Sequence, residues 1–175
     1  VQYSTTKTPK LEDKQSVIAR IKEASKYVPL ENLYLSPQCG FASCEIGNKL
    51  TEEEQWAKLK LVKEMHMEDQ LIYSSFNHYS LMQLKQLDDH VQTGILFSDG
   101  WINPAMYAKN LGINAVHPAV YHLKYPQFME EVKRAGLKMH VWTANKPEHI
   151  QLVKDADAEA VITNYPDRAL EIVGK

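Results

Sequence analysis

The chain has 175 residues, of which 44% are hydrophobic and 24% are charged, and this length suffices for one well-buried core. The 20 basic and 22 acidic residues nearly cancel, which argues against nucleic acid or an anionic membrane as a partner. No apolar run approaches the roughly 20 residues that span a bilayer, and we expect no signal peptide in residues 1–10. Since two cysteines, Cys39 and Cys44, are too few for a disulfide framework, we expect a cytoplasmic protein.

Short apolar runs alternate with longer segments of helical period, which is the pattern of parallel βα units. The runs are apolar without strict alternation, as expected for strands that are covered on both faces. The predicted strands, in chain order, are Val1–Ser4, Asn32–Ser36, Leu71–Phe76, Gly94–Phe97, Ala115–His117, Met139–Thr143 and Ala160–Thr163.

The helices are marked by apolar stripes and by their ends. The first carries a stripe over 17–28 behind an acidic first turn, Glu12–Asp13, and the second opens on a capping box of Thr51 and Glu54. The remaining predicted helices are Tyr79–Leu87, Pro104–Leu111, one from Pro126 to a C-cap at Gly136, Pro147–Asp155 and Asp167–Val173.

After residue 70 the predicted strands start every 20 to 25 residues, a spacing typical of a TIM barrel. We therefore predict an α/β fold with a (β/α)8 TIM-barrel-like parallel sheet, in one domain over residues 1–175. The pattern supplies about seven βα units, and such a sheet cannot close like an eight-unit barrel without an altered shear or a gap. Free strand edges favour self-association, as a dimer or by exchange of an element.

The first third of the chain, the segment 1–63, contains the blocks Tyr27–Pro29, Leu35–Phe41 and Ile46–Leu50. By these blocks, residues 5–63 resemble the C-terminal end of cobalamin-independent methionine synthases. This resemblance implies that Cys39 is a zinc-bound thiolate. The chain has no His-x-Cys pair to supply further ligands, and a catalytic zinc takes three. The alternative is a lone thiol at the mouth of a barrel strand.

The segment 64–175 contains the blocks Ser74–Asn77, His117–Pro118, Gly136–Lys138, His140–Thr143 and Ile162–Asp167. By these blocks it resembles the C-terminal part of glycerophosphodiester phosphodiesterases. The resemblance implies a barrel that hydrolyses glycerophosphodiesters with a divalent cation, calcium or magnesium. Two histidines would act as general base and general acid, and acidic residues would hold the metal.

In that family the reacting groups lie on early strands that begin with His-Arg-Gly, and no His-Arg pair occurs in this chain. The matching residues belong to the far wall of the substrate pocket. By resemblance, Phe76, His117 and Trp142 form the apolar surface that holds the glycerol part. We expect Asn164 to end the last strand and to face the barrel mouth, where phosphate or glycerol would bind.

Seven histidines invite a metal or an acid–base interpretation. His117 ends a predicted strand, where barrel active sites lie, and His140 shares a strand face with Trp142. These two are either the remains of a polar pocket or satisfied interior side chains, and we favour the second interpretation. The others are predicted to be surface groups: His66, His78, His90, His122 and His149.

The resemblances together predict a recombined barrel scaffold, an engineered chimera joined inside a helix near Leu61–Met67, without an intact catalytic site. Barrel units repeat with the same handedness, so one helix can continue into another without altering the sheet. The alternative is a metal-dependent glycerophosphodiester phosphodiesterase that uses Glu45 or Asp99 in place of the missing acids. A further alternative is a zinc-binding methyltransferase remnant centred on Cys39.

Overall fold

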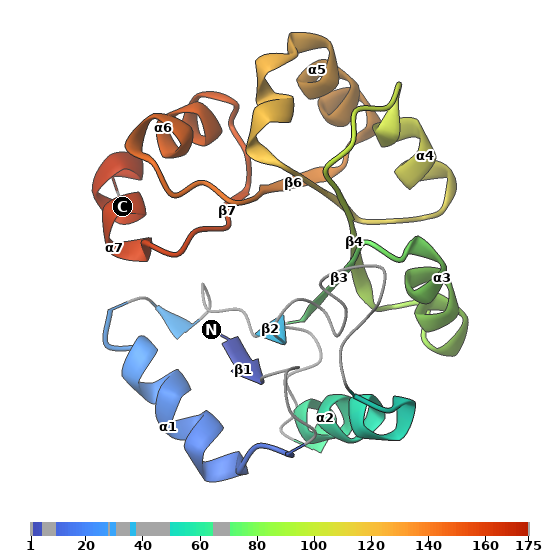
Figure 1. Ribbon diagram of the computed structural model, residues 1–175, viewed down its shortest axis with the longest axis vertical. Helices are drawn as coiled ribbons and strands as arrows, with labels where there is room; N and C mark the ends of the chain where they lie inside the picture. Colours follow the sequence, from blue (N-terminus) through green and yellow to red (C-terminus); the bar gives the residue numbers. More distant parts are fainter. Residues whose placement is uncertain are drawn as a thin grey trace. The chain divides into compact units, whose positions relative to one another are not determined.

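The computed structural model describes residues 2–4, 10–27, 29–30, 36–37, 50–64 and 71–174. The chain forms two compact units, Val1–Gln92 and Thr93–Lys175 (Figure 1). It remains a prediction that residues 1–175 form one domain, in which the segments 1–63 and 64–175 meet. Cys39, Cys44 and Glu45 lie outside the described residues, and so does the predicted strand at 32–35.

The first unit begins with a two-stranded parallel sheet, in which β1 pairs with β2. Its helices follow the predicted periodicity, and α2 continues through Leu61 to Glu64, so helix lies on at least the first residues of the predicted join. The elements are β1 (Gln2–Ser4), α1 (Lys14–Ala24), β2 (Ser36–Pro37), α2 (Glu52–Glu64), β3 (Ile72–Ser75) and α3 (His78–Leu87).

Two helix starts in this unit are capped by side chains, and the capping box at Thr51 and Glu54 is as predicted. The predicted acidic first turn Glu12–Asp13 is wrong, because α1 begins only at Lys14 and Asp13 is its N-cap. The Asp13 carboxylate accepts a hydrogen bond from the Ser16 amide at 2.8 Å and so caps α1. At α2 the capping box is complete, because the Thr51 amide donates to Glu54 Oε2 at 2.8 Å and the Glu54 amide donates to Thr51 Oγ1 at 3.3 Å. Such reciprocal bonds satisfy amides that a helix end leaves without partners.

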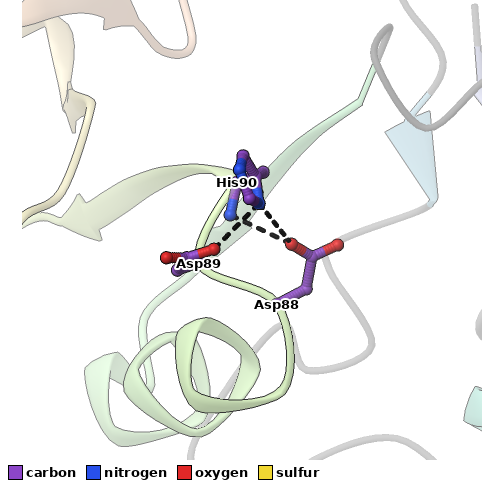
Figure 2. Close-up of side chains that lie close together, drawn as sticks. All are labelled: Asp88, Asp89 and His90. Atoms are coloured by element: carbon purple, nitrogen blue, oxygen red, sulfur yellow. Dashed lines mark hydrogen bonds and ion pairs between the residues drawn. The ribbon is translucent and has the colours of Figure 1, made fainter.

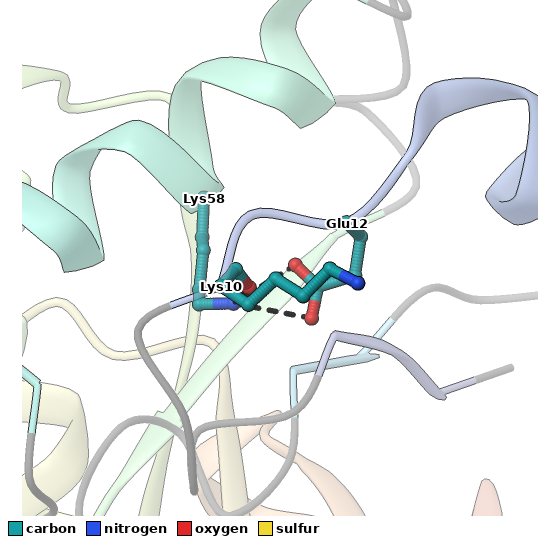
Figure 3. A network of polar contacts seen from close by, with 3 residues as sticks. All are labelled: Lys10, Glu12 and Lys58. Carbon is teal, nitrogen blue, oxygen red and sulfur yellow. Dashed lines mark hydrogen bonds and ion pairs between the residues drawn. The ribbon is translucent and has the colours of Figure 1, made fainter.

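A buried ion pair joins α2 to the segment before α1 (Figure 3). The Lys58 side chain is fully buried, and its Nζ donates to Glu12 Oε2 at 2.9 Å and to the Lys10 carbonyl at 2.7 Å. A buried ammonium is tolerated only where such partners replace water. Removing Glu12 alone would leave the buried Lys58 ammonium without a counter-charge. The ion pair therefore favours the packing of α2 that places Lys58 beside Glu12.

The second unit alternates strands and helices, and β4, β5, β6 and β7 are parallel neighbours in that order. Helices α4 to α7 lie on one side of these strands (Figure 1). The elements are β4 (Gln92–Phe97), α4 (Pro104–Asn110), β5 (Ala115–Pro118), the 3₁₀ helix η4 (Val120–Lys124), α5 (Pro126–Ala135), β6 (Lys138–Val141), α6 (Pro147–Asp155), β7 (Ala160–Val161) and α7 (Pro166–Val173).

The strands of this unit have two distinct faces, since side chains alternate along a strand. Phe97 packs edge-on against Phe128 of α5, with ring centroids 6.1 Å apart, so its face is covered by helices. Ile95 and Val116 share that face by register and are fully buried. Residues of the other parity, among them His117 and His140, therefore point to the face that the helices do not cover.

Helix α5 ends as predicted at Gly136, whose φ of 70° is the left-handed conformation that favours glycine. The helix η4 after β5 was not predicted from the sequence. Among the described residues, no helix has both the length and the apolar character that crossing a membrane requires.

Candidate functional site

A buried pair of imidazoles occupies the uncovered face of the sheet. His140 Nδ1 lies 3.0 Å from His117 Nε2, and the two side chains are only 8% and 3% exposed. Each histidine is the third residue of its strand, and the register of β5 with β6 pairs Val116 with Met139. The register thus sets the two rings side by side, with centroids 4.8 Å apart.

The neighbouring strand β4 makes room for this pair by carrying Gly94. A Cβ atom at this position would overlap the His117 ring, with two ring carbons at 2.5 and 2.8 Å. A side chain of any size is therefore excluded here, and the glycine is required by the close approach of the imidazole.

Both imidazoles are held in the neutral form. Burial, and to a lesser extent the neighbouring His140, lowers the pKa of His117 to about 3. Burial also lowers the pKa of His140, although the Glu159 carboxylate opposes this shift. A neutral imidazole has one donor and one acceptor nitrogen, so one ring donates to the other. The geometry is that of mutually satisfied interior side chains.

Trp142 lies directly beyond the pair, at the carboxyl end of β6. Its indole Nε1–H donates to the His117 carbonyl at 2.6 Å, and its own carbonyl accepts from the Val120 amide at 2.6 Å. These two bonds tie Trp142 to both sides of the β5 end, so the indole has a defined orientation while it stays half-buried. An apolar ring at a strand's carboxyl end is placed where barrel enzymes bind substrates.

The loops after β6 and β7 are joined through Asn145. Its Oδ1 accepts from the Asn164 amide at 2.9 Å and from Thr163 Oγ1 at 3.3 Å, and its carbonyl accepts from Arg168 at 3.3 Å. The Arg168 guanidinium also lies 4.7 Å from the centre of the Tyr165 ring. The positively charged side chain of Arg168 is therefore held at the same edge of the sheet as Trp142.

The predicted site residues are only partly brought together. His117 and Trp142 are hydrogen-bonded, and Asn164 is exposed in the adjoining loop, linked through Asn145. Phe76 follows β3 in the first unit and is 42% exposed. The sequence analysis missed Gly94, Asn145 and the direct contact of His140. The shared third position of the two histidines in their strands could have indicated that contact.

The prediction that His122 is a surface group is wrong, because its side chain is only 6% exposed. Its Nδ1 lies 3.1 Å from the Ala119 carbonyl and its Nε2 lies 3.3 Å from the Asp99 carbonyl. The unpredicted helix η4 causes the difference, since it turns this side chain inward against Phe97, with ring centroids 5.1 Å apart. His90 is exposed as predicted.

One group of potential metal ligands occurs among the described residues, formed by Asp88, Asp89 and His90 (Figure 2). His90 Nδ1 lies 2.8 Å from the Asp89 carboxylate and 3.4 Å from that of Asp88, and all three side chains are exposed. This group directly precedes β4, at the amino ends of the strands. Barrel active sites lie at the opposite, carboxyl ends of the strands, so the place of this group in the chain does not indicate a catalytic cation site.

Comparison with known proteins identifies relatives of two kinds. A glycerophosphodiester phosphodiesterase of Caldanaerobacter subterraneus subsp. tengcongensis is 31% identical over 117 residues, which are 67% of this chain and 48% of that protein. The chain thus spans about half the length of this curated relative. The uncharacterized protein YxjG of Bacillus subtilis is 62% identical over 61 residues, which are 35% of this chain and 16% of that protein.

Among solved structures, a phosphodiesterase from Oleispira antarctica in complex with the product sn-glycerol-3-phosphate has a TM-score of 0.62 and 24% identity, over 82% of this chain and 55% of that chain. This likeness confirms the predicted α/β, TIM-barrel-like fold. The model of the glycerophosphoryl diester phosphodiesterase family matches residues 41–168. Since this match covers more than half of the residues, the chain belongs to the glycerophosphoryl diester phosphodiesterase family.

Proposed function

We propose that the protein hydrolyses glycerophosphodiesters, as a phosphoric diester hydrolase whose substrate wall lies at the carboxyl ends of β5 to β7. One observation carries the proposal: in a chain of this family, the Trp142 indole is held at that edge by the His117 carbonyl at 2.6 Å. The flat apolar ring would pack against the carbon atoms of the glycerol part.

Arg168 would supply the charge that an anionic phosphodiester needs. It lies in the first turn of α7 and is positioned by the Asn145 carbonyl and the Tyr165 ring. A guanidinium presents planar donors that match phosphate oxygens. The prediction of phosphate or glycerol at the barrel mouth, near Asn164, follows from the same arrangement.

A divalent cation, calcium or magnesium, remains the expected cofactor of the family. Within the described ranges, no three acidic or imidazole side chains converge at the carboxyl edge, so we derive no chemical step through a metal. Asp99 follows β4 at that edge and stays a predicted ligand. Glu45 and a zinc at Cys39 likewise stay predictions, because both residues lie outside the described ranges.

The proposal is tested by hydrolysis of glycerophosphocholine with calcium or magnesium, compared with the same assay in a chelator. We expect chelator-sensitive release of glycerol 3-phosphate, with KM raised about tenfold in Trp142→Ala and in Arg168→Gln, since each loses a substrate contact of 1–2 kcal/mol. Trp56→Ala, a substitution of a partly exposed tryptophan on α2, is the matched control and should leave KM unchanged. Absence of turnover with either cation would overturn the proposal.

The second candidate is the recombined scaffold without catalytic activity. It would combine a segment similar to YxjG, which is 62% identical over 61 residues, with a segment similar to the phosphodiesterase relative, which is 31% identical over 117 residues. A folded protein that lacks turnover in the assay above would favour this candidate.

A further inference from the structure

We propose that the carboxyl edge of the second unit binds a single apolar chain, so that the preferred ligand is a glycerophosphodiester that carries one acyl or alkyl group. The inference rests on the proposed function, because it extends the same substrate wall. It starts from a set of exposed apolar side chains, here called the apolar rim: Trp101, Ile102, Met106, Tyr107 and Tyr121.

The side chains of the rim are well exposed. Ile102 is 95% exposed, Met106 is 50% exposed and Tyr121 is 47% exposed. Single exposed apolar residues need no explanation, but neighbouring ones on a soluble protein mark a binding surface. The rim comes from the loop after β4, the start of α4 and the helix η4, all of which follow carboxyl ends of strands.

The rim is held rigidly rather than being a loose loop. The Trp101 ring packs edge-on against Tyr107 and Phe97, with centroids at 4.8 and 5.9 Å. Asn103 follows in the left-handed conformation, and its Oδ1 accepts from the Met106 amide at 3.1 Å. Ile102 is therefore presented to solvent by fixed neighbours, which lowers the entropy that ligand binding would cost.

The rim is continuous with the proposed substrate wall. The Trp142 carbonyl accepts from the Val120 amide at 2.6 Å, and Tyr121 is the next residue. The Tyr121 hydroxyl donates to the Ser98 carbonyl, three residues before Trp101. A ligand whose glycerol part contacts Trp142 could thus extend an apolar group over Tyr121 toward Ile102.

The chemistry of the rim favours one apolar chain over larger partners. A stable protein interface takes about 20–30 residues on each side, whereas the rim has five side chains. An anionic membrane surface would require an excess of basic residues, but 98–110 contains one acid, Asp99, and one base, Lys109. Neither a second copy nor a bilayer fits these features as well.

The test measures binding, which does not depend on turnover. Affinities for 1-octanoyl-lysophosphatidylcholine, below its micellar concentration, and for glycerophosphocholine are compared by calorimetry with the full chain. We expect the octanoyl compound to bind at least tenfold more tightly. Ile102→Ser should weaken only its binding, about fivefold, and Ile102→Ser with Met106→Ser should nearly abolish the preference. Leu170→Ser, on α7 and 38% exposed, should change neither affinity.

Each outcome decides the matter. Equal affinities for the two compounds, or equal losses in Ile102→Ser and Leu170→Ser, would overturn the proposal. So would cosedimentation with phosphatidylcholine vesicles without binding of the monomeric compound, or a dimer that Ile102→Ser dissociates. Chain-dependent binding without hydrolysis of glycerophosphocholine would instead overturn the proposed function and leave the rim assignment standing.

Discussion

At the scale of single residues, Gly94 is the position on which the histidine pair depends most directly. In Gly94→Ala the added methyl would overlap the His117 ring, so the ring or the strand must shift. We expect a loss of about 2 kcal/mol in the free energy of unfolding, the usual cost of overpacking. Urea denaturation measures it.

Gly100→Ala is the matched control for that substitution. Nothing lies within 4 Å of a Cβ atom at Gly100, so its free energy of unfolding should change by no more than about 0.5 kcal/mol. Equal stability of Gly94→Ala and the parent protein would contradict the close packing of the imidazole on β4.

The neutral state of His117 makes stability depend on pH. Its pKa is about 3 in the folded protein, whereas the ordinary value for a histidine is 6.5, so the unfolded chain binds more protons between these values. Stability is therefore complete above pH 6.5 and falls as the pH drops from 6.5 toward 3, by roughly 2 kcal/mol at pH 5 from this residue.

Thermal unfolding from pH 7.5 to 4.5 measures this effect, with His117→Gln as the comparison because glutamine does not titrate. The melting temperature of the variant should depend less on pH over this range, although it starts lower. Parallel curves for the two proteins would show that His117 is not the group responsible.

At the scale of elements, the capping box of α2 is a separable contribution. Thr51→Ala removes the acceptor that lies 3.3 Å from the Glu54 amide and should cost about 1 kcal/mol of stability. Thr51→Ser keeps the hydroxyl and should restore most of it, as measured by denaturant unfolding. A loss of the same size in both variants would contradict the role of the hydroxyl.

The sequence was sufficient for elements whose ends carry local marks. α5 has proline at its start and Gly136 at its end, and α6 begins and ends at the predicted residues. The sequence did not predict η4, because this helix has no such residues at its ends. The burial of the His122 side chain was therefore not predicted either. The histidine pair depends on the register of β5 with β6, a contact between residues 23 apart, which single-strand patterns do not encode.

At the scale of the whole molecule, we propose that the protein associates with itself. Among the described residues, β7 pairs with β6 alone, and about seven predicted βα units cannot close like eight. Light scattering at rising concentration should give a mass near twice the 20.1 kDa of one chain. A constant mass of one chain at high concentration would contradict the proposal.

The buried ion pair of Lys58 has a chemical consequence. Its ammonium group is fully buried against Glu12, whereas the neighbouring Lys60 is exposed. An amine-acylating reagent acts on a free, accessible amine, so in the folded protein it should modify Lys60 and spare Lys58. The ratio of modified Lys58 to modified Lys60, measured by peptide mass spectrometry, therefore reports how often the first unit opens.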